Sequence, residues 1–201
     1  PPSQSDEGLD RLQEAPTPES LHAAGTTFRP SQQRLPPDSV MAEAVRSEFL
    51  HAWHGYLEHA RGMDALRPLS QSGRNWYDAS LVMTPLDAFD TMLLMDLPEE
   101  AAVAKELIME GLTFDHDFHV QVFEVNIRIL GGLLAAYQMD GDPRFLKLAT
   151  DLGDRMLPAF QSATGMPYVR VNLRTGQRER PLNNPAEIGT LMLEFGTLSR
   201  L

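Results

Sequence analysis

Residues 120–137, VQVFEVNIRILGGLLAAY, form the stretch that decides the fold of this 201-residue chain. Read as a helix, one face carries an acid, a base and two residues with almost no side chain, at steps of four, three and four: Glu124, Arg128, Gly131 and Ala135. The opposite face is apolar, with Ile129, Leu130, Leu133 and, on the flank, Leu134. Glycine inside a helix costs about 1 kcal/mol relative to alanine. The pair Gly131–Gly132 therefore indicates that another group approaches closely.

Two interpretations of this helix stay open at this point. Glu124 and Arg128 could form an ion pair within the helix, worth about 0.2–0.5 kcal/mol, beside a tight helix crossing. Alternatively, the two side chains belong to a polar site that the glycines leave accessible.

Outward from this segment, the apolar spacing predicts further helices with short connections. They are expected from Asp38 or Ser39 to near Gly62, across 85–97, at about 99–111, 119–139 and 142–157, and from Asn184 or Pro185 through Leu201. Residues 168–177 alternate apolar and polar side chains up to a glycine turn, which predicts a short strand or hairpin. Neighbouring helices in pairs indicate an all-α fold of stacked helical hairpins.

Composition excludes several classes of function. Lys and Arg number 17 against 28 Asp and Glu, a net charge of −11, which argues against a nucleic-acid partner. No apolar run approaches the roughly 18 residues of a membrane span. The absence of cysteine removes disulfides, thiolate metal sites and cysteine nucleophiles. Residues 1–38 contain seven prolines and no apolar period, so we expect an extended or disordered lead-in before a folded domain over 39–201.

Other carboxylates also stand on apolar helices. Asp87 and Asp90 lie three residues apart, Glu187 lies in the first turn of the last helix, and Glu194 follows seven residues later. Asp87 and Asp90 could cap neighbouring helices or pair with an arginine, or they could line a polar pocket. The helix dipole, which favours a carboxylate in the first turn, is enough to explain Glu187. His51, His54 and the cluster 115–119 lack the His-Glu-x-x-His pattern, so a transition-metal site is not expected.

Taken together, these segments resemble the class I α-mannosidases, glycoside hydrolase family 47. The resemblance covers about residues 40–201, and its most specific part is Phe-Glu-x-x-Ile-Arg-x-Leu-Gly-Gly at 123–132. The other matching stretches are LDAFDTM at 86–92, Gly141-Asp142, MLPAF at 156–160, Pro167-Tyr168, Val171-Asn172, Thr175-Gly176, Ala186-Glu187 and LEF at 193–195.

The resemblance implies an (α/α)7 barrel of paired helices around a cavity, of which this chain would be the N-terminal part. It implies an inverting glycosidase that removes terminal α-1,2-linked mannose from oligomannose glycans. By the same match, Glu124 is the acid that protonates the leaving oxygen, Arg128 holds that acid and the substrate, and Glu187 contacts the sugar. Asp87, Asp90, Gly131 and Glu194 are expected to line or support the cavity.

A bound Ca²⁺ is also implied, with its protein ligand outside this segment and its water molecules held by carboxylates such as Glu124 and Glu187. The general base would lie outside as well, so residues 1–201 alone are expected to be inactive. Two alternatives remain: a mannose-recognising protein of the same fold with little or no turnover, and a helical scaffold without a sugar site.

The expected partner is an oligomannose or α-1,2-mannobiose-type glycan, and the expected oligomeric state is a monomer. The family implies the secretory pathway or another place outside the cytoplasm. The chain has neither cysteine nor an Asn-x-Ser/Thr acceptor, which favours a bacterial periplasmic or secreted enzyme.

Overall fold

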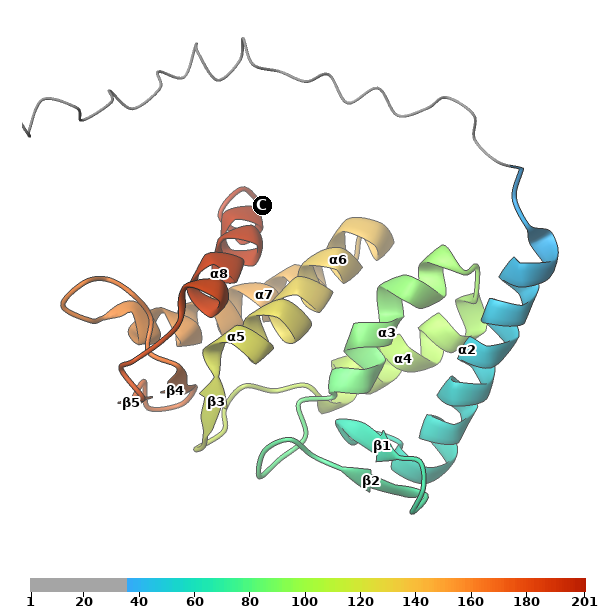
Figure 1. The fold of residues 1–201 in the computed structure, drawn as a ribbon, viewed down its shortest axis with the longest axis horizontal. Helices are drawn as coiled ribbons and strands as arrows, with labels where there is room; N and C mark the ends of the chain where they lie inside the picture. Colours follow the sequence, from blue (N-terminus) through green and yellow to red (C-terminus); the bar gives the residue numbers. More distant parts are fainter. Residues whose placement is uncertain (1–35) are drawn as a thin grey trace, which may run out of the picture. The chain divides into compact units, whose positions relative to one another are not determined.

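The computed structural model describes residues 36–201, so the lead-in expected over 1–38 lies almost entirely outside the described residues. The chain divides into two units, Pro1–Ser39 and Val40–Leu201, and the second is described here (Figure 1). Among the described residues, no helix combines the length and the apolar character needed to cross a bilayer.

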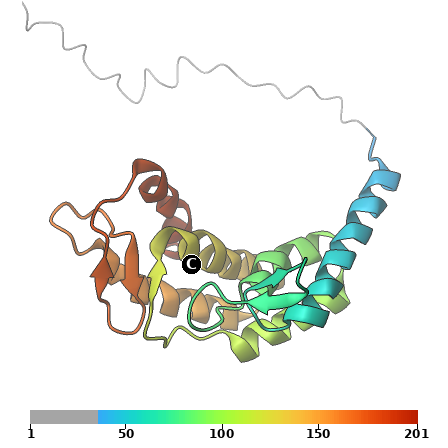
Figure 2. The same cartoon turned by 60° about the horizontal axis from the view of Figure 1, so that its bottom comes forward.

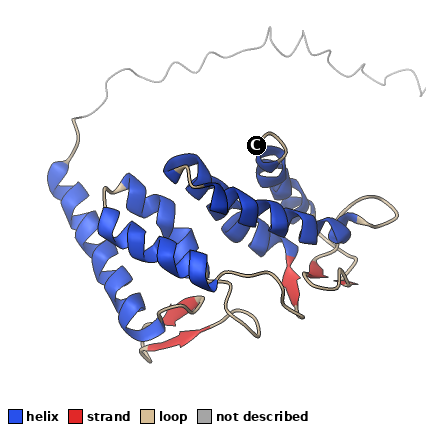
Figure 3. Ribbon diagram, turned by 180° about the vertical axis from the view of Figure 1, so that it is seen from behind, coloured by secondary structure: helices blue, strands red, loops and turns tan. Residues whose placement is uncertain are grey.

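Helices dominate the second unit. They are α2 (Ser39–Ala60), α3 (Met83–Leu94), α4 (Pro98–Gly111), α5 (Val122–Val125), the π turn η1 (Asn126–Leu130), α6 (Gly131–Asp140), α7 (Pro143–Met156), the 3₁₀ turn η2 (Leu157–Phe160) and α8 (Pro185–Leu198). Helix α3 packs against α6, and η1 packs against α8, while α4 packs against α3 and α7 against α6 and α8. Figure 3 shows these helices from behind. The predicted all-α fold of helical hairpins is confirmed.

Short strands connect the helices at one end. Strands β1 (Ala65–Arg67) and β2 (Ser72–Arg74) form an antiparallel hairpin that the sequence did not predict. Strands β3 (His119–Gln121), β4 (Arg170–Asn172) and β5 (Arg178–Glu179) form an antiparallel sheet in which Val120 lies opposite Val171 (Figure 2). The hairpin predicted near 168–177 is therefore confirmed, with Gly176 at a φ of 71° in its turn.

Two helix boundaries and the exposure of some apolar residues differ from the prediction. The helix expected from His119 begins only at Val122, because residues 119–121 pair with β4 instead. The last helix ends at Leu198, where the final residues form turns, so the helix expected to run through Leu201 is shorter. Met41 and Val45 belong to the apolar spacing that predicts α2, yet they are 60% and 49% exposed, and Leu94 of α3 is 75% exposed.

A buried carboxylate organises the loop that leads into α3. Asp64 is 1% exposed, and its side chain accepts hydrogen bonds from the backbone N–H groups of Trp76, Leu81 and Met83 and from the hydroxyl of Ser80, at 2.7–3.3 Å. Between two of these donors, Val82 adopts a φ of 51°, which a β-branched residue rarely does. The hydrogen bonds of Asp64 on both sides hold this strained residue and fix the start of α3.

Candidate functional site

The centre of the site is the pair Glu124–Arg128. Glu124 lies in the short helix α5, three residues after Gln121, the last β3 residue that pairs with β4, so the sheet fixes the place of its backbone. Its Oε2 accepts a hydrogen bond from Arg128 Nε at 2.8 Å. The ion pair within the helix, one of the two interpretations of the sequence, is therefore present, and its contacts extend beyond the helix.

Arg128 also contacts α3 and the loop before it. Its Nη1 donates to Asp87 Oδ2 at 3.3 Å, and its Cζ lies 5.1 Å from the centre of the Trp76 ring. Burial lowers the pKa of Arg128, but the hydrogen bond to Glu124 and the charge of Asp87 outweigh it and raise the pKa above its usual range. Two carboxylates and an indole from separate segments thus hold one planar guanidinium in place.

The two carboxylates of α3 lie in different surroundings. Burial raises the pKa of Asp87, and the nearby charges of Asp90 and Glu124 add to this, while Arg128 opposes it. Asp90 accepts only a long hydrogen bond, 3.4 Å, from the hydroxyl of its neighbour Thr91 among the contacts described. The structure brings Asp87 to the arginine and leaves Asp90 a residue of the adjoining helix surface.

Glu187 lies in the first turn of α8, as predicted. Asn184 caps this helix, since its Oδ1 accepts a hydrogen bond from the Glu187 N–H at 2.9 Å. The Glu187 Oε2 atom is buried and has no hydrogen-bond partner within residues 36–201. A buried carboxylate oxygen needs a donor, so a ligand hydroxyl or a water molecule is suited to this position.

Glu194 is the most buried of the predicted site carboxylates, at 8% exposed. Its Oε2 accepts a hydrogen bond from Asn126 Nδ2 at 2.6 Å, across the contact between η1 and α8. The sequence reasoning missed Asn126, although an asparagine inside an otherwise apolar helix was a signal for a buried polar contact. It also missed Trp76, a lone aromatic residue in a loop.

The two glycines face different neighbours. The sequence placed Gly131 on the face of Glu124 and Arg128, but the π turn inserts about one residue between them, a rotation of about 100°. Gly131 therefore faces Glu194 of α8, and Gly132 takes the side toward α3, where it lies against Leu86.

Alanine should distinguish these two positions. A Cβ at residue 132 would lie 2.9 Å from Leu86 Cγ, whereas one at residue 131 would lie 3.5 Å from Glu194 Cγ, an ordinary contact. We expect Gly132→Ala to lower the free energy of unfolding by about 1–2 kcal/mol, because overpacking outweighs the gain in helix propensity. Gly131→Ala, the matched control, should be neutral or stabilising. Urea unfolding of both variants measures this, and equal effects would refute the assignment of the two faces.

Two clefts are lined by residues of the candidate site. The first, of about 480 Å³, includes Trp76 in its wall and is lined by Trp76, Tyr77, Asp78, Asp117, Phe118, His119, Arg170 and Glu179. A smaller one of about 260 Å³ is lined by Gly131, Leu134, Ala135, Gln138, Leu193, Glu194 and Thr197. A larger hollow of about 700 Å³ lies between α2 and the β1–β2 hairpin, and of the predicted site residues none lines it.

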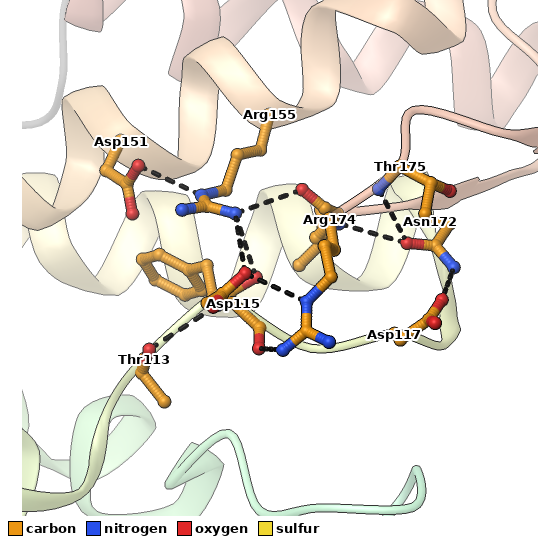
Figure 4. A network of polar contacts seen from close by, with 10 residues as sticks. Thr113, Asp115, Asp117, Asp151, Arg155, Asn172, Arg174 and Thr175 are labelled. Atoms are coloured by element: carbon orange, nitrogen blue, oxygen red, sulfur yellow. Dashed lines mark hydrogen bonds and ion pairs between the residues drawn. The ribbon is translucent and has the colours of Figure 1, made fainter.

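A polar network fixes the loop that leads into β3 (Figure 4). Arg174 donates to the side chain and the backbone carbonyl of Asp115, at 2.9 and 2.6 Å. Asn172 Nδ2 donates to Asp117 Oδ1 at 2.8 Å, and Arg155 of α7 donates to the backbone carbonyl of Phe114 at 3.4 Å. This loop carries the acidic and histidine residues at 115–119. The hydrogen bonds of Asp115 and Asp117 fix the backbone of the loop that leads through β3 to Glu124.

The atoms of the site that could face a metal ion are carboxylate oxygens, which are hard ligands and suit Ca²⁺ rather than a softer metal. Within residues 36–201, no group of three or more histidine and carboxylate side chains is arranged to bind a metal ion directly. Arg128 bonds to one oxygen each of Glu124 and Asp87, Oε2 and Oδ2, and the buried Glu187 Oε2 has a free acceptor position. These carboxylates fit a role in holding water molecules around an ion.

Glycoside hydrolysis needs two carboxyl groups at one site, and this chain brings two carboxyl groups together at Arg128. The family model for glycosyl hydrolase family 47 matches residues 48–201, and the chain belongs to this family. The endoplasmic reticulum mannosyl-oligosaccharide 1,2-alpha-mannosidase of Homo sapiens is 39% identical over 204 residues, covering 100% of this chain and 28% of that protein.

Two further relatives extend the comparison. The ER degradation-enhancing alpha-mannosidase-like protein 2 of Mus musculus is 38% identical over 180 residues, with 83% of this chain and 31% of that protein covered. An alpha-1,2-mannosidase structure from Trichoderma reesei superimposes with a TM-score of 0.76 at 29% identity, covering 83% of this chain and 38% of that one. The helices therefore have the fold of part of an (α/α)7 barrel. The chain spans roughly a third or less of the length of the curated relatives it matches.

Proposed function

We propose that this chain is the N-terminal part of the catalytic domain of an inverting glycosidase that removes terminal α-1,2-linked mannose from oligomannose glycans. The observation that carries the proposal is the cluster of Glu124, Arg128 and Asp87, which joins two helices inside the region of the family match. The names of the relatives, mannosyl-oligosaccharide and α-1,2-mannosidases, support this substrate class.

In this proposal, Glu124 donates a proton to the oxygen that leaves the cleaved mannose. Inverting hydrolysis also needs a base that activates water on the opposite face of the sugar, with the two carboxyl groups roughly 6.5–9.5 Å apart. That base would come from outside this chain. Arg128, held by Asp87 and Trp76, fixes the orientation of Glu124 and retains donors for sugar hydroxyls.

Glu187 would act on the sugar or on its bound water. Its buried Oε2 accepts no hydrogen bond within residues 36–201, so it can accept one from a hydroxyl group of the glycan. Ca²⁺, when bound, would order sugar hydroxyls through its coordination shell. Glu124 and Glu187 would hold its water molecules. The protein would work in the secretory pathway or outside the cytoplasm, as the relatives named for the endoplasmic reticulum support. The bacterial periplasmic or secreted location rests on sequence composition alone.

The test is hydrolysis of α-1,2-mannobiose by the full-length protein, followed by proton NMR of the first product. We expect release of the β-anomer of mannose, loss of activity with a chelator, and better recovery with added Ca²⁺ than with Zn²⁺. Calorimetry supplies the second arm, because binding of mannobiose without release would indicate a mannose-recognising protein of the same fold. Neither binding nor release would overturn both forms of the proposal.

A further inference from the structure

We infer that Asn126 is a positioning residue, which holds Glu194 so that one carboxylate oxygen faces the cleft between α6 and α8 as a sugar-binding group. The inference rests on the proposed function, since it assigns a part of the same substrate site. It concerns a residue that the sequence motifs alone gave no role.

The π turn creates the place that Glu194 occupies. Residues five apart lie on the same side of a π turn, and Asn126 and Gly131 are five apart at its two ends. Asn126 thereby supplies a donor, and Gly131 leaves the space next to it empty. In a regular helix, Gly131 would rotate by about 100° away from this side, and a side chain would stand near the Glu194 carboxylate instead.

The hydrogen bond fixes which oxygen of Glu194 is used. A carboxylate only accepts, so the amide nitrogen of Asn126 must face it, and Oε2 takes this bond at 2.6 Å. The other oxygen, Oε1, lies beside Gly131, 3.7 Å from where a Cβ would stand. Gly131 and Glu194 both line the cleft of about 260 Å³, so Oε1 lies at the edge of a space that can admit a hydroxyl or a water molecule.

The burial of this pair favours a functional over a purely structural role. Asn126 is 0% exposed, and its Oδ1 is buried without a partner within residues 36–201. Burying a carboxylate and an amide, with one amide oxygen unpaired, is a poor way to stabilise a helix contact, since apolar side chains of similar volume do so at least as well. The arrangement instead keeps one charged group in a fixed direction.

Three variants of the full-length protein test the inference. Asn126→Leu removes the donor at similar volume, and Glu194→Gln keeps an oxygen that can accept from Asn126 but removes the charge. Asn126→Asp combined with Glu194→Gln reverses donor and acceptor, so that the bond is kept while the charge moves to the buried position. The unfolding temperature and the kcat and KM for α-1,2-mannobiose are measured for each, with Asn126→Ser as a milder form if Asn126→Leu does not fold.

We expect all three variants to lose at least tenfold in kcat/KM, mainly through KM, and the double variant to unfold at a higher temperature than Asn126→Leu. The inference is overturned if Asn126→Leu keeps kcat/KM within twofold of wild type while its unfolding temperature falls, which is the result of a structural contact. It is also overturned if the double variant regains activity within threefold of wild type. A wild-type protein that releases no mannose would instead show that the proposed function has failed.

Discussion

Glu124→Gln is expected to lower kcat of the full-length protein by about 10²–10⁴-fold while leaving the unfolding temperature within a few degrees of wild type. The amide has the shape of the carboxyl group and its oxygen can still accept from Arg128 Nε, so the local structure should persist. It carries no acidic proton, so the leaving oxygen would depart unprotonated. Initial rates on α-1,2-mannobiose measure the effect.

Glu110→Gln is the matched control for this substitution. Glu110 is exposed in the last turn of α4, outside the cluster around Arg128, and undergoes the same chemical change. Its rate should equal that of wild type. Glu124→Gln with a rate within threefold of wild type would show that Glu124 is not the acid and that its pair with Arg128 is structural.

The largest effect on stability is expected for Asp64→Ala, a loss of more than about 3 kcal/mol in the free energy of unfolding. The substitution leaves four donors of the loop before α3 without their acceptor and releases the strained backbone of Val82. Because Trp76 is one of these donors, the indole beside Arg128 should also lose its place. Thermal and urea unfolding measure the loss.

Asp78→Ala is the control, because Asp78 is an exposed aspartate of the same loop. It should change the free energy of unfolding by less than about 0.5 kcal/mol. If the two substitutions cost the same, the stability of the loop does not depend on the hydrogen bonds of Asp64.

Helix periodicity predicted most helices closely, because the apolar spacing of α4 and α7 reflects burial on one side of each. It could not predict the π turn at Asn126–Leu130, because the apolar and polar residues around Arg128 are spaced in a way that fits an α-helix as well as a π turn. That one turn moved Gly131 from the face of Arg128 to the face of Glu194. The predicted start of the same helix at His119 was wrong. Residues 119–121 are compatible with a helix, but they pair with β4 instead.

The site was predictable where one helix carries two of its members, as Glu124 and Arg128 show. Asp87 was among the candidates, and pairing with an arginine was one of its two interpretations, but the spacing could not say which arginine. Asn126 contacts Glu194, 68 residues away in the sequence, and Trp76 contacts Arg128, 52 residues away. Local sequence patterns cannot predict such distant contacts. Whether these residues act on a sugar stays a prediction.

The pairing of β3 with β4 bears on the order in which the molecule is built during synthesis. The contacts within α3–α4 and within α6–α7 join neighbours along the chain, so these hairpins can form as soon as each leaves the ribosome. The strand just ahead of Glu124 finds its partner only after Arg170–Asn172 have emerged, which requires closing a loop of about fifty residues. Glu124 would thus be fixed in place late, after the neighbouring helical hairpins have formed. A nascent chain that stalls before β4 would contain Glu124 but would lack the strand pairing that positions it.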